Sequence, residues 1–314
     1  MSGTSLYLVL PCYNEEAIIN QSFKELYNML QGLLEKKIIS DKSKIVFVDD
    51  GSTDATWQLI TVLKEKHHIV KALKLAKNAG HQNAILAGLL EYKNEADCII
   101  TIDADLQDDI NVIEDMVKQF QEGNEIVYGV RNKRETDTFF KKQTALAFYK
   151  LMGIMGVNII YNHADYRLAS SKALNELSRF KEVNLFLRSM FPLLGFKTSR
   201  VYYNRLKRQA GETKFSLRKM VSFSLNGITS FSIAPLRLIT FLGLGIFLLS
   251  IIFVIYAVYS YVVFDTTKGW ASTTLPIYFL GGIQLLCIGI IGEYLGKIYN
   301  EVKQRPRYII EKQL

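Results

Sequence analysis

The sequence predicts an α/β domain with a mostly parallel sheet and helices on both faces, followed by an amphipathic segment and two membrane-spanning helices. Two observations lead to this fold class. Short apolar runs typical of buried strands alternate with segments of helical spacing from residue 6 onward, which is the pattern of a parallel sheet. Two long stretches without a charged residue, 238–264 and 269–292, then follow near the C-terminus.

The first part of the domain alternates strands with helices. The predicted strands are 6–10, 44–48, 69–75 and 98–102, and the predicted helices between them are 15–36, 57–66 and 82–92. A cluster of polar residues follows each strand. Because ligands of such sheets bind beyond the carboxyl ends of the strands, these clusters are expected to form one site.

The second part of the domain is less regular. A helix at 112–121, a strand at 125–130 and a helix at 138–157 precede a polar segment at 162–168. Helices at 170–177 and 183–194, a strand at 196–204 and a basic loop at 205–214 complete it. The expected organisation is a domain at 1–214, amphipathic juxtamembrane helices at 215–235, a transmembrane hairpin at 236–297 and a basic tail at 298–314.

The strand at 98–102 runs into the strongest candidate site. Asp103 and Asp105 are two residues apart, so in an extended chain both carboxylates point to the same side. Like charges this close repel, and a divalent cation bound with a substrate diphosphate would remove the conflict. Gln107 supplies a third oxygen ligand. The alternative is an acidic loop that caps the next helix, which is the expected role of Asp108 and Asp109.

Hydrophobicity and charge indicate a membrane protein. Hydrophobic residues make up 49% of the 314 residues, and each uncharged stretch exceeds the ~20 residues that a bilayer-spanning helix needs. The net charge of +8 is expected to attract anionic lipid headgroups rather than nucleic acid. Basic residues flank the spans on their outer ends, which places both termini and the domain in the cytoplasm; these residues are Arg237, Lys297, Lys303, Arg305 and Arg307. The three scattered cysteines indicate neither a disulfide framework nor a zinc site.

Six clusters, in order along the chain, carry a resemblance to a known family. They read PCYNEE at 11–16, DDGSTD at 49–54, KNAGH at 77–81, DADLQD at 103–108, DYRL at 165–168 and RQAGETKF at 208–215. With the two spans, they make the chain resemble family 2 glycosyltransferases of the GT-A (Rossmann-like) fold. Within that family it is most similar to bacterial polyprenyl-phosphate glycosyltransferases (bactoprenol glucosyltransferase-like) related to dolichol-phosphate mannose synthase. Lys77 and Thr213 depart mildly from the usual Arg and Ser.

The resemblance implies a nucleotide-sugar site in the first clusters. Carboxylates can accept from a uracil ring N–H, and a tyrosine can stack on the base. The residues implied are Pro11, Tyr13, Asn14, Glu15, Asp49, Asp50, Gly51, Ser52, Lys77, Asp103 and Ala104. Asn14 is also expected to cap the helix that follows. An ordinary turn is the alternative for 50–52, and a solvated lysine is the alternative for Lys77.

The resemblance also implies the catalytic and metal residues. Mg²⁺ or Mn²⁺ would be held by Asp103, Asp105 and Gln107, and Asp105 and Asp165 would be catalytic. Asp165 resembles the family residue proposed as the catalytic base. A phosphate monoester is already largely anionic at neutral pH, however, so a base is not required. The alternative role of Asp165 is to position Arg167 or the sugar hydroxyls.

Four basic residues are the candidate ligands of the acceptor phosphate. They are Arg131, Arg134, Arg208 and Lys214. Arginine pairs bidentately with phosphate, and the family resemblance places the loop after the strand at 125–130 toward the acceptor. A solvated basic loop is the alternative. His81 and His163 are expected to be structural hydrogen-bonding residues.

The expected function is metal-dependent, inverting transfer of a sugar, glucose first, from a UDP-sugar to undecaprenyl phosphate at the cytoplasmic face of the cell membrane. The resemblance implies a homotetramer, and a flippase and a downstream glycosyltransferase would use the product. A processive polysaccharide synthase is disfavoured because neither Trp57 nor Trp270 lies in a Gln-x-x-Arg-Trp motif. A membrane-anchored nucleotide-binding assembly protein without turnover is the alternative from another class. No GxGxxG follows the first strand, so a dinucleotide site is excluded.

Overall fold

The computed structural model describes residues 3–132, 163–183, 186–204, 234–263 and 269–314. Within them the chain divides into two compact units. The sheet unit includes residues 304–314 at the C-terminus, and the helical unit contains the two long C-terminal helices. The chain therefore ends in the unit in which it begins.

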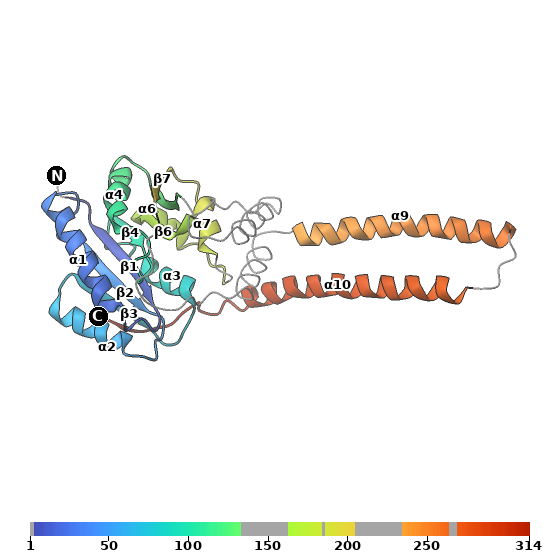
Figure 1. Cartoon of the computed structure of the whole chain (residues 1–314), viewed down its shortest axis with the longest axis horizontal. Coiled ribbons are helices and arrows are strands. Elements are labelled where there is room, and N and C mark those ends of the chain that lie inside the picture. Colours follow the sequence, from blue (N-terminus) through green and yellow to red (C-terminus); the bar gives the residue numbers. More distant parts are fainter. Residues whose placement is uncertain (1–2, 133–162, 184–185, 205–233, 264–268) are drawn as a thin grey trace. The chain divides into compact units, whose positions relative to one another are not determined.

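The described strands form one mixed sheet in the order β7-β5-β6-β4-β1-β2-β3-β8 (Figure 1). They are β1 (Leu6–Cys12), β2 (Lys44–Asp49), β3 (Val70–Leu75), β4 (Cys98–Thr101), β5 (Ile126–Arg131), β6 (His163–Ser170), β7 (Thr198–Tyr203) and β8 (Ile310–Gln313). Neighbours pair in parallel, except that β6 is antiparallel to β4 and β5, and β8 is antiparallel to β3. The prediction of a mostly parallel sheet is confirmed.

Helices cover both faces of the sheet. Those of the sheet unit are α1 (Ile19–Glu35), α2 (Thr56–Lys66), α3 (His81–Tyr92), η1 (Ile110–Val112), α4 (Ile113–Gln121), α6 (Ser171–Leu177) and α7 (Leu187–Leu193). Leu8 of β1 packs in the apolar cluster that contains Ile19 of α1. The next residue of β1, Val9, meets α3, where a Cβ added to Gly88 would lie 2.5 Å from Val9 Cγ1. Since successive side chains of a strand point to opposite faces, α1 and α3 lie on opposite faces, and α3 needs a glycine here.

The first helix begins later than the sequence predicts. It starts at Ile19 rather than at Glu15, and no side chain caps it, so the prediction that Asn14 is its cap is wrong. Asn14 Oδ1 instead accepts from the backbone N–H of Thr53 at 2.9 Å, and the Glu15 N–H donates to Thr56 Oγ1 at 2.9 Å. These contacts hold the chain after β1 against the loop after β2, and the helix forms only beyond them.

β6 lies in the interior of the sheet although the sequence indicates a polar segment there. Asp165 and Arg167 are 9% and 2% exposed in this strand. Their spacing places both on one face, where Arg167 Nη2 donates to Asp165 Oδ1 at 2.7 Å. The two charges compensate each other, which allows a strand with this composition to be buried.

β8 was not predicted, because the sequence suggests only a basic tail at 298–314. Residues up to Val302 belong to a helix, and β8 then pairs with the edge strand β3. Ala72 exchanges backbone hydrogen bonds with Leu314 at 2.9 and 3.1 Å, and the Ala76 N–H donates to the Ile309 carbonyl at 2.9 Å. The C-terminal residues thus cover the edge of the sheet beside the turn that follows β3.

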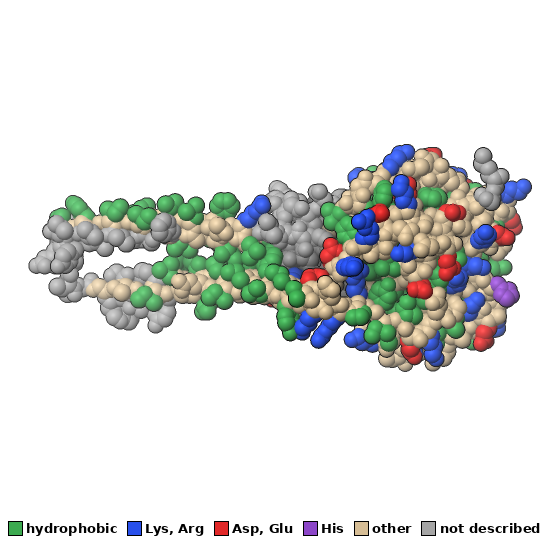
Figure 2. All heavy atoms as spheres, turned by 180° about the vertical axis from the view of Figure 1, so that it is seen from behind, with side chains coloured by type: hydrophobic (Ala, Val, Ile, Leu, Met, Phe, Trp, Pro, Cys, Tyr) green, Lys and Arg blue, Asp and Glu red, His purple; other side chains and the backbone are tan. Residues whose placement is uncertain are grey.

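The helical unit contains α9 (Ala234–Val263) and α10 (Trp270–Val302). Hydrophobic side chains line the described parts of both helices (Figure 2). One segment of the described residues, Phe279–Val302 in α10, is long and apolar enough to cross a membrane. The helix predicted at 138–157 and residues 215–233 of the predicted amphipathic segment lie outside the described residues, and residues 234 and 235 of that segment belong to α9.

Candidate active site

The polar clusters after β1, β2, β3 and β4 meet at one edge of the sheet, because these four strands are parallel. The strand order separates two groups of side chains. Those that follow β1, β2 and β3 lie on one side of β4, and those carried by β5 and β6 lie on the other. Asp103, which follows β4, stands at the boundary between the two.

The residues after β1 contribute the exposed ring of Tyr13 and a hydrogen bond to the loop after β2. Pro11 is buried in β1, whereas Tyr13 is 39% exposed. The Asn14 N–H donates to Ser52 Oγ at 3.0 Å. Of these predicted nucleotide residues, Tyr13 can therefore meet a ligand, and Asn14 and Ser52 join the two loops.

Asp49 and Asp50, although adjacent, have different surroundings. Asp49 is fully buried; its Oδ1 accepts from the Ser52 N–H at 3.2 Å, and its Oδ2 has no hydrogen-bond partner among the described residues. Asp50 accepts from the N–H groups of Ala79 at 2.7 Å and Gly80 at 3.0 Å. Burial raises the pKa of both carboxyl groups. Asp50 thus holds the turn after β3, and Asp49 retains an unused acceptor.

The turn at 77–80 is held from two sides. Asp50, in the loop after β2, accepts from its backbone N–H groups, and the Ile309 carbonyl accepts from the N–H of Ala76 just before it. Gly51 has φ +67°, and a Cβ there would lie 2.6 Å from the backbone of Lys77 and Asn78, so this position requires glycine. Lys77 itself is exposed. The structure thus confirms a turn at 50–52, and its role in binding a nucleotide stays a prediction.

The segment after β4 is a tight turn. The Leu106 N–H donates to the Asp103 carbonyl at 3.1 Å, and Leu106 has φ +46°. Asp103 is 44% exposed, whereas Gln107 is 6% exposed. Ala104 is buried, and its carbonyl accepts from Ser22 Oγ at 2.6 Å. The turn therefore presents Asp103 to the site and buries Ala104 and Gln107.

The described residues contain no group of three His, Cys, Asp or Glu side chains that could hold a metal ion. Asp103 is nevertheless suited to one. Desolvation and the nearby carboxylates of Asp108, Asp165 and Asp105 raise the pKa of Asp103 to about 6, against the opposing effect of His81. Mg²⁺ typically takes one or two carboxylates plus substrate phosphates, so an exposed carboxylate without a protein cage fits a cation that arrives with a diphosphate.

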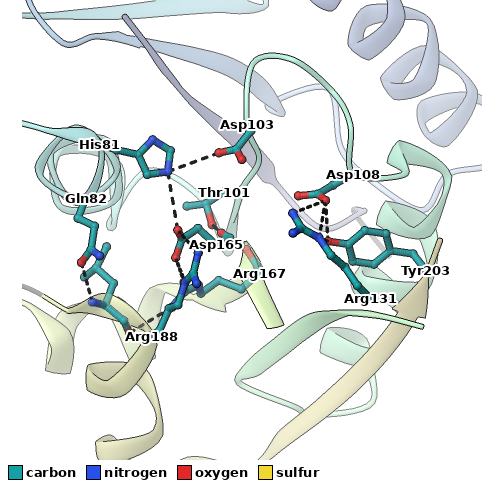
Figure 3. Close-up of polar contacts among 11 residues, drawn as sticks. His81, Gln82, Thr101, Asp103, Asp108, Arg131, Asp165, Arg167, Arg188 and Tyr203 are labelled. Carbon is teal, nitrogen blue, oxygen red and sulfur yellow. Dashed lines mark hydrogen bonds and ion pairs between the residues drawn. The ribbon is translucent and has the colours of Figure 1, made fainter. Parts of the chain in front are cut away.

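Asp165 is held by two arginines (Figure 3). Arg167 Nη2 donates to its Oδ1 at 2.7 Å; Arg188 donates from Nε to Oδ1 at 3.2 Å and from Nη2 to Oδ2 at 3.1 Å. Burial alone would raise the pKa of Asp165, but Arg188 and Arg167 lower it far below its usual range. Asp165 is therefore a poor proton acceptor at neutral pH and a strong anchor for the two guanidinium groups.

His81 lies between the carboxylates of Asp103 and Asp165. Its Nε2 is 3.5 Å from Asp103 Oδ1 and 3.7 Å from Asp165 Oδ2, and its side chain is 48% exposed (Figure 3). It is the first residue of α3, directly after the turn that Asp50 holds. His81 thus connects the turn after β3 with β4 and β6, a position that its sequence context did not indicate.

Asp108 does not cap a helix. Its Oδ1 accepts from Arg131 Nη2 at 2.9 Å and from Tyr203 Oη at 2.7 Å, and Asp108 is 2% exposed. Asp109 does cap, accepting from the Asn111 N–H at 2.9 Å. The expectation was wrong for Asp108 because its partners lie on β5 and β7. The nearby carboxylate raises the pKa of Arg131, which stays charged.

Replacing Arg131 with alanine should destabilise the sheet unit by about 3 kcal/mol, because it leaves the buried Asp108 carboxylate without its counter-charge. Thermal unfolding of the purified protein would measure this. Lys118→Ala is the matched control, since Lys118 and Glu114 form an exposed, solvent-screened ion pair whose loss should change the midpoint little. Equal midpoints for the two variants would contradict the buried pair.

Sequence reasoning missed three side chains of this edge. Arg188 is the only charged residue in the predicted apolar helix 183–194, and a lone charge there could have indicated a residue of the site. Gln82 Oε1 accepts from the Leu187 N–H at 3.0 Å, and Tyr203 bonds Asp108; neither contact had a local signal. The predicted residues Arg134, Arg208 and Lys214 lie outside the described residues.

Comparisons with known proteins identify the family of the chain. The model of glycosyl transferase family 2 matches residues 7–178, and that of the GtrB C-terminal hairpin matches residues 234–298. The chain is 53% identical over 306 residues to the uncharacterized glycosyltransferase YkoT of Bacillus subtilis (strain 168), covering 98% of this chain and 91% of that protein. It is 38% identical over 307 residues to the prophage bactoprenol glucosyl transferase homolog of Escherichia coli (strain K12), covering 97% and 98%.

Among solved structures, the chain is similar to the mannosyltransferase PcManGT from Pyrobaculum calidifontis in complex with GDP-Man and Mn²⁺. Its TM-score is 0.48 at 15% identity, covering 93% of this chain and 87% of that one. The family match spans β1 to α6 and includes the clusters after β1, β2, β3 and β4. From this match and the extent of the sequence similarity, the chain belongs to glycosyl transferase family 2 and is a glycosyltransferase.

Proposed function

We propose that this glycosyltransferase transfers a sugar, with glucose as the first candidate, from a UDP-sugar to a polyprenyl phosphate such as undecaprenyl phosphate. The observation that carries the proposal is the similarity, over 97% of the chain, to a bactoprenol glucosyl transferase homolog. The membrane-type helix and the carboxylate-lined edge of the sheet agree with a lipid acceptor and a nucleotide-sugar donor.

The donor half of the site would be formed by the loops after β1, β2 and β3. Asp49 Oδ2 is a buried acceptor without a partner among the described residues, as a uracil N–H would require. Tyr13 offers an exposed ring for stacking on the base, with Pro11 and Glu15 beside it. Lys77, exposed on the turn that Asp50 fixes, would meet the donor phosphates.

The chemical step we propose is a single displacement with inversion. An oxygen of the acceptor phosphate attacks the anomeric carbon, the bond from this carbon to the donor diphosphate breaks, and UDP leaves with the electron pair. The acceptor is largely anionic at neutral pH and needs no base. Asp165, with its lowered pKa, would then act by positioning Arg167 and Arg188.

Asp103 and Asp105 would hold Mg²⁺ or Mn²⁺ together with the donor diphosphate. Gln107, predicted as the third ligand, is 6% exposed, so as the chain stands it supports the turn rather than facing the cation. A bound cation would neutralise charge on the diphosphate as it leaves. Arg131 would reach the acceptor phosphate only by sharing its guanidinium with Asp108, so the greater part of acceptor binding is assigned to Arg134, Arg208 and Lys214.

Two membrane crossings follow from the covalent path of the chain if α9 and α10 enter a bilayer. β7 precedes α9, β8 follows α10, and both strands belong to one sheet. A sheet cannot continue across a bilayer, so the chain must cross an even number of times between them. This supports a two-helix hairpin, and the basic residues that flank it favour a cytoplasmic catalytic domain.

Reporters fused before Met1 and after Leu314 should therefore both give a cytoplasmic signal in the bacterial membrane. The physical reason is that β8 must pair with β3 on the side where the sheet folds. A reporter inserted in the 264–268 segment between α9 and α10 is the internal control and should read on the opposite side. A non-cytoplasmic signal from either terminus would refute the hairpin.

The direct test uses membranes that contain the full chain, undecaprenyl phosphate and a panel of nucleotide sugars, with mass spectrometry of the lipid extract. We expect one lipid-linked sugar, and none from membranes with the Asp103→Asn variant. A wild-type protein that binds UDP but forms no product with any donor would instead indicate an assembly protein. A homotetramer, a flippase and a downstream glycosyltransferase remain the partners expected from the family resemblance.

A further inference from the structure

The turn at 77–80 has little side-chain packing to fix its conformation, since residues 76–78 are exposed. Hydrogen bonds on its backbone hold it instead. At the far end, N–H groups of the turn donate to the carboxylate of Asp50. At the near end, the N–H of Ala76 donates to the carbonyl of Ile309 at 2.9 Å. One of the supports of this turn therefore comes from the C-terminal segment of the chain.

The C-terminal segment is itself anchored to the sheet unit on both sides of Ile309. Before it, Arg307 Nη2 donates to the carbonyl of Phe180, just beyond α6. After it, Leu314 exchanges two backbone hydrogen bonds with Ala72 of β3, at 2.9 and 3.1 Å (Figure 1). Ile309 is 62% exposed, so its contact with the turn is made by the backbone carbonyl and not by packing of its side chain.

The register of β8 on β3 brings Ile309 to the turn. Leu75, the last residue of β3, pairs with Ile310, the first residue of β8, and the two strands run antiparallel. The residue before β8 must then meet the residue after β3. Glu311 Oε2 supports the same pairing through an ion pair with Lys74 Nζ at 2.9 Å. Pairing of the two strands, rather than the side chain of Ile309, thus fixes this end of the turn.

We propose that residues 309–314 are a positioning segment for the donor site: by pairing β8 with β3, they hold the turn at 77–80 in the conformation that presents Lys77 to the donor phosphates. The inference rests on the proposed function and adds to its donor site a segment that lies beyond both matched family regions, 7–178 and 234–298. A turn that is ordered before the donor arrives lowers the entropic cost of binding.

The test compares the wild-type full chain with a variant in which residues 309–314 are replaced by an alternating Gly–Ser sequence of the same length. Initial rates are measured while undecaprenyl phosphate and the UDP-sugar selected by the donor panel are varied separately. A flexible Gly–Ser segment does not keep β8 paired, so donor binding must order the turn. We expect the apparent constant for the UDP-sugar to rise roughly five- to thirtyfold and that for the lipid to stay unchanged.

The double variant Ile309→Val, Ile310→Val is the matched control. Valine favours strands as isoleucine does, and it keeps the backbone carbonyl at position 309, so both constants should stay at their wild-type values. Thermal unfolding shows whether each variant is folded. The milder double variant Ile309→Gly, Ile310→Gly weakens the strand at the same two positions and keeps the test valid should the Gly–Ser variant fail to fold.

Equilibrium binding of UDP to the purified full-length variants, followed by calorimetry, gives a second readout that does not depend on turnover. We expect weaker UDP binding by the Gly–Ser variant and by the double glycine variant, and wild-type affinity for the double valine variant. The turn carries Lys77, which would meet the phosphates that UDP retains, so this measurement reports the same contact as the constant for the UDP-sugar.

The outcomes separate this inference from the proposed function. Wild-type constants and wild-type UDP affinity in a folded but destabilised variant would overturn the inference, since β8 would then only cover the edge of the sheet. A rise confined to the lipid constant, or an equal rise in both constants, would also overturn it. By contrast, a wild-type protein that binds UDP but makes no lipid-linked sugar would refute the proposed function, and UDP binding by the variants would still test the segment.

Discussion

Asp103→Asn and Asp105→Asn should each abolish sugar transfer and leave the protein folded in the membrane. A cation at a leaving diphosphate contributes several kcal/mol of transition-state stabilisation, and about 4 kcal/mol corresponds to a thousandfold in rate. Asp103 is 44% exposed at the strand end, so asparagine there removes charge without disturbing the core. Radiolabelled sugar transfer into a lipid extract, together with an unfolding midpoint, would measure both effects.

Asp109→Asn is the control for these variants. Asp109 lies in the same acidic segment but caps η1, and asparagine caps nearly as well, so turnover should be preserved. Excess EDTA should stop the wild-type enzyme, and Mg²⁺ or Mn²⁺ should restore it. Undiminished turnover in EDTA would refute the assignment of a metal to the turn after β4.

Asp165→Asn should lower both stability and turnover, for a reason other than the loss of a base. It removes the charge that compensates Arg167, which is 2% exposed, and breaking a buried pair typically costs about 3–5 kcal/mol. Thermal or denaturant unfolding would detect a loss of this size. Because Arg167 and Arg188 are released together, this part of the site should also lose its geometry, and transfer should fall at every pH.

The pH profile separates the two roles of Asp165. Its folded-state pKa is lowered, so the stabilisation that it provides is complete above its unfolded pKa of about 4 and is lost only as the pH falls below that. Neutral and alkaline solutions should therefore leave this contribution unchanged. If the activity of Asp165→Asn instead recovers toward high pH, hydroxide is replacing a missing base and the positioning role is wrong.

The sequence by itself determined the elements whose signal is local. The alternation of strands and helices from β1 to β4 was readable because apolar spacing within one segment sets its type. The placement of Asp49, Lys77 and Asp103 at one edge followed as well, since the carboxyl ends of parallel strands meet there. The family and the class of reaction also followed from these clusters.

Only the tertiary structure decided which charged groups compensate each other. β6 was missed because a buried Asp165 is acceptable only with Arg167 and Arg188 bound to it, and Arg188 is distant in sequence. Asp108 was expected to cap a helix, and its partner Arg131 comes from β5. β8 was missed because a short polar strand forms only on the open edge that β3 supplies.

Tertiary structure also divided the roles within one motif. Asp49 and Asp50 are adjacent, yet one keeps a buried acceptor unused and the other is occupied by the turn after β3. A local pattern can specify that two carboxylates end a strand. Which carboxylate keeps an acceptor unused depends on the backbone N–H groups of the turn after β3, which lie beside Asp50 and not beside Asp49. Buried carboxylates accept hydrogen bonds from the donors nearest to them in the folded chain.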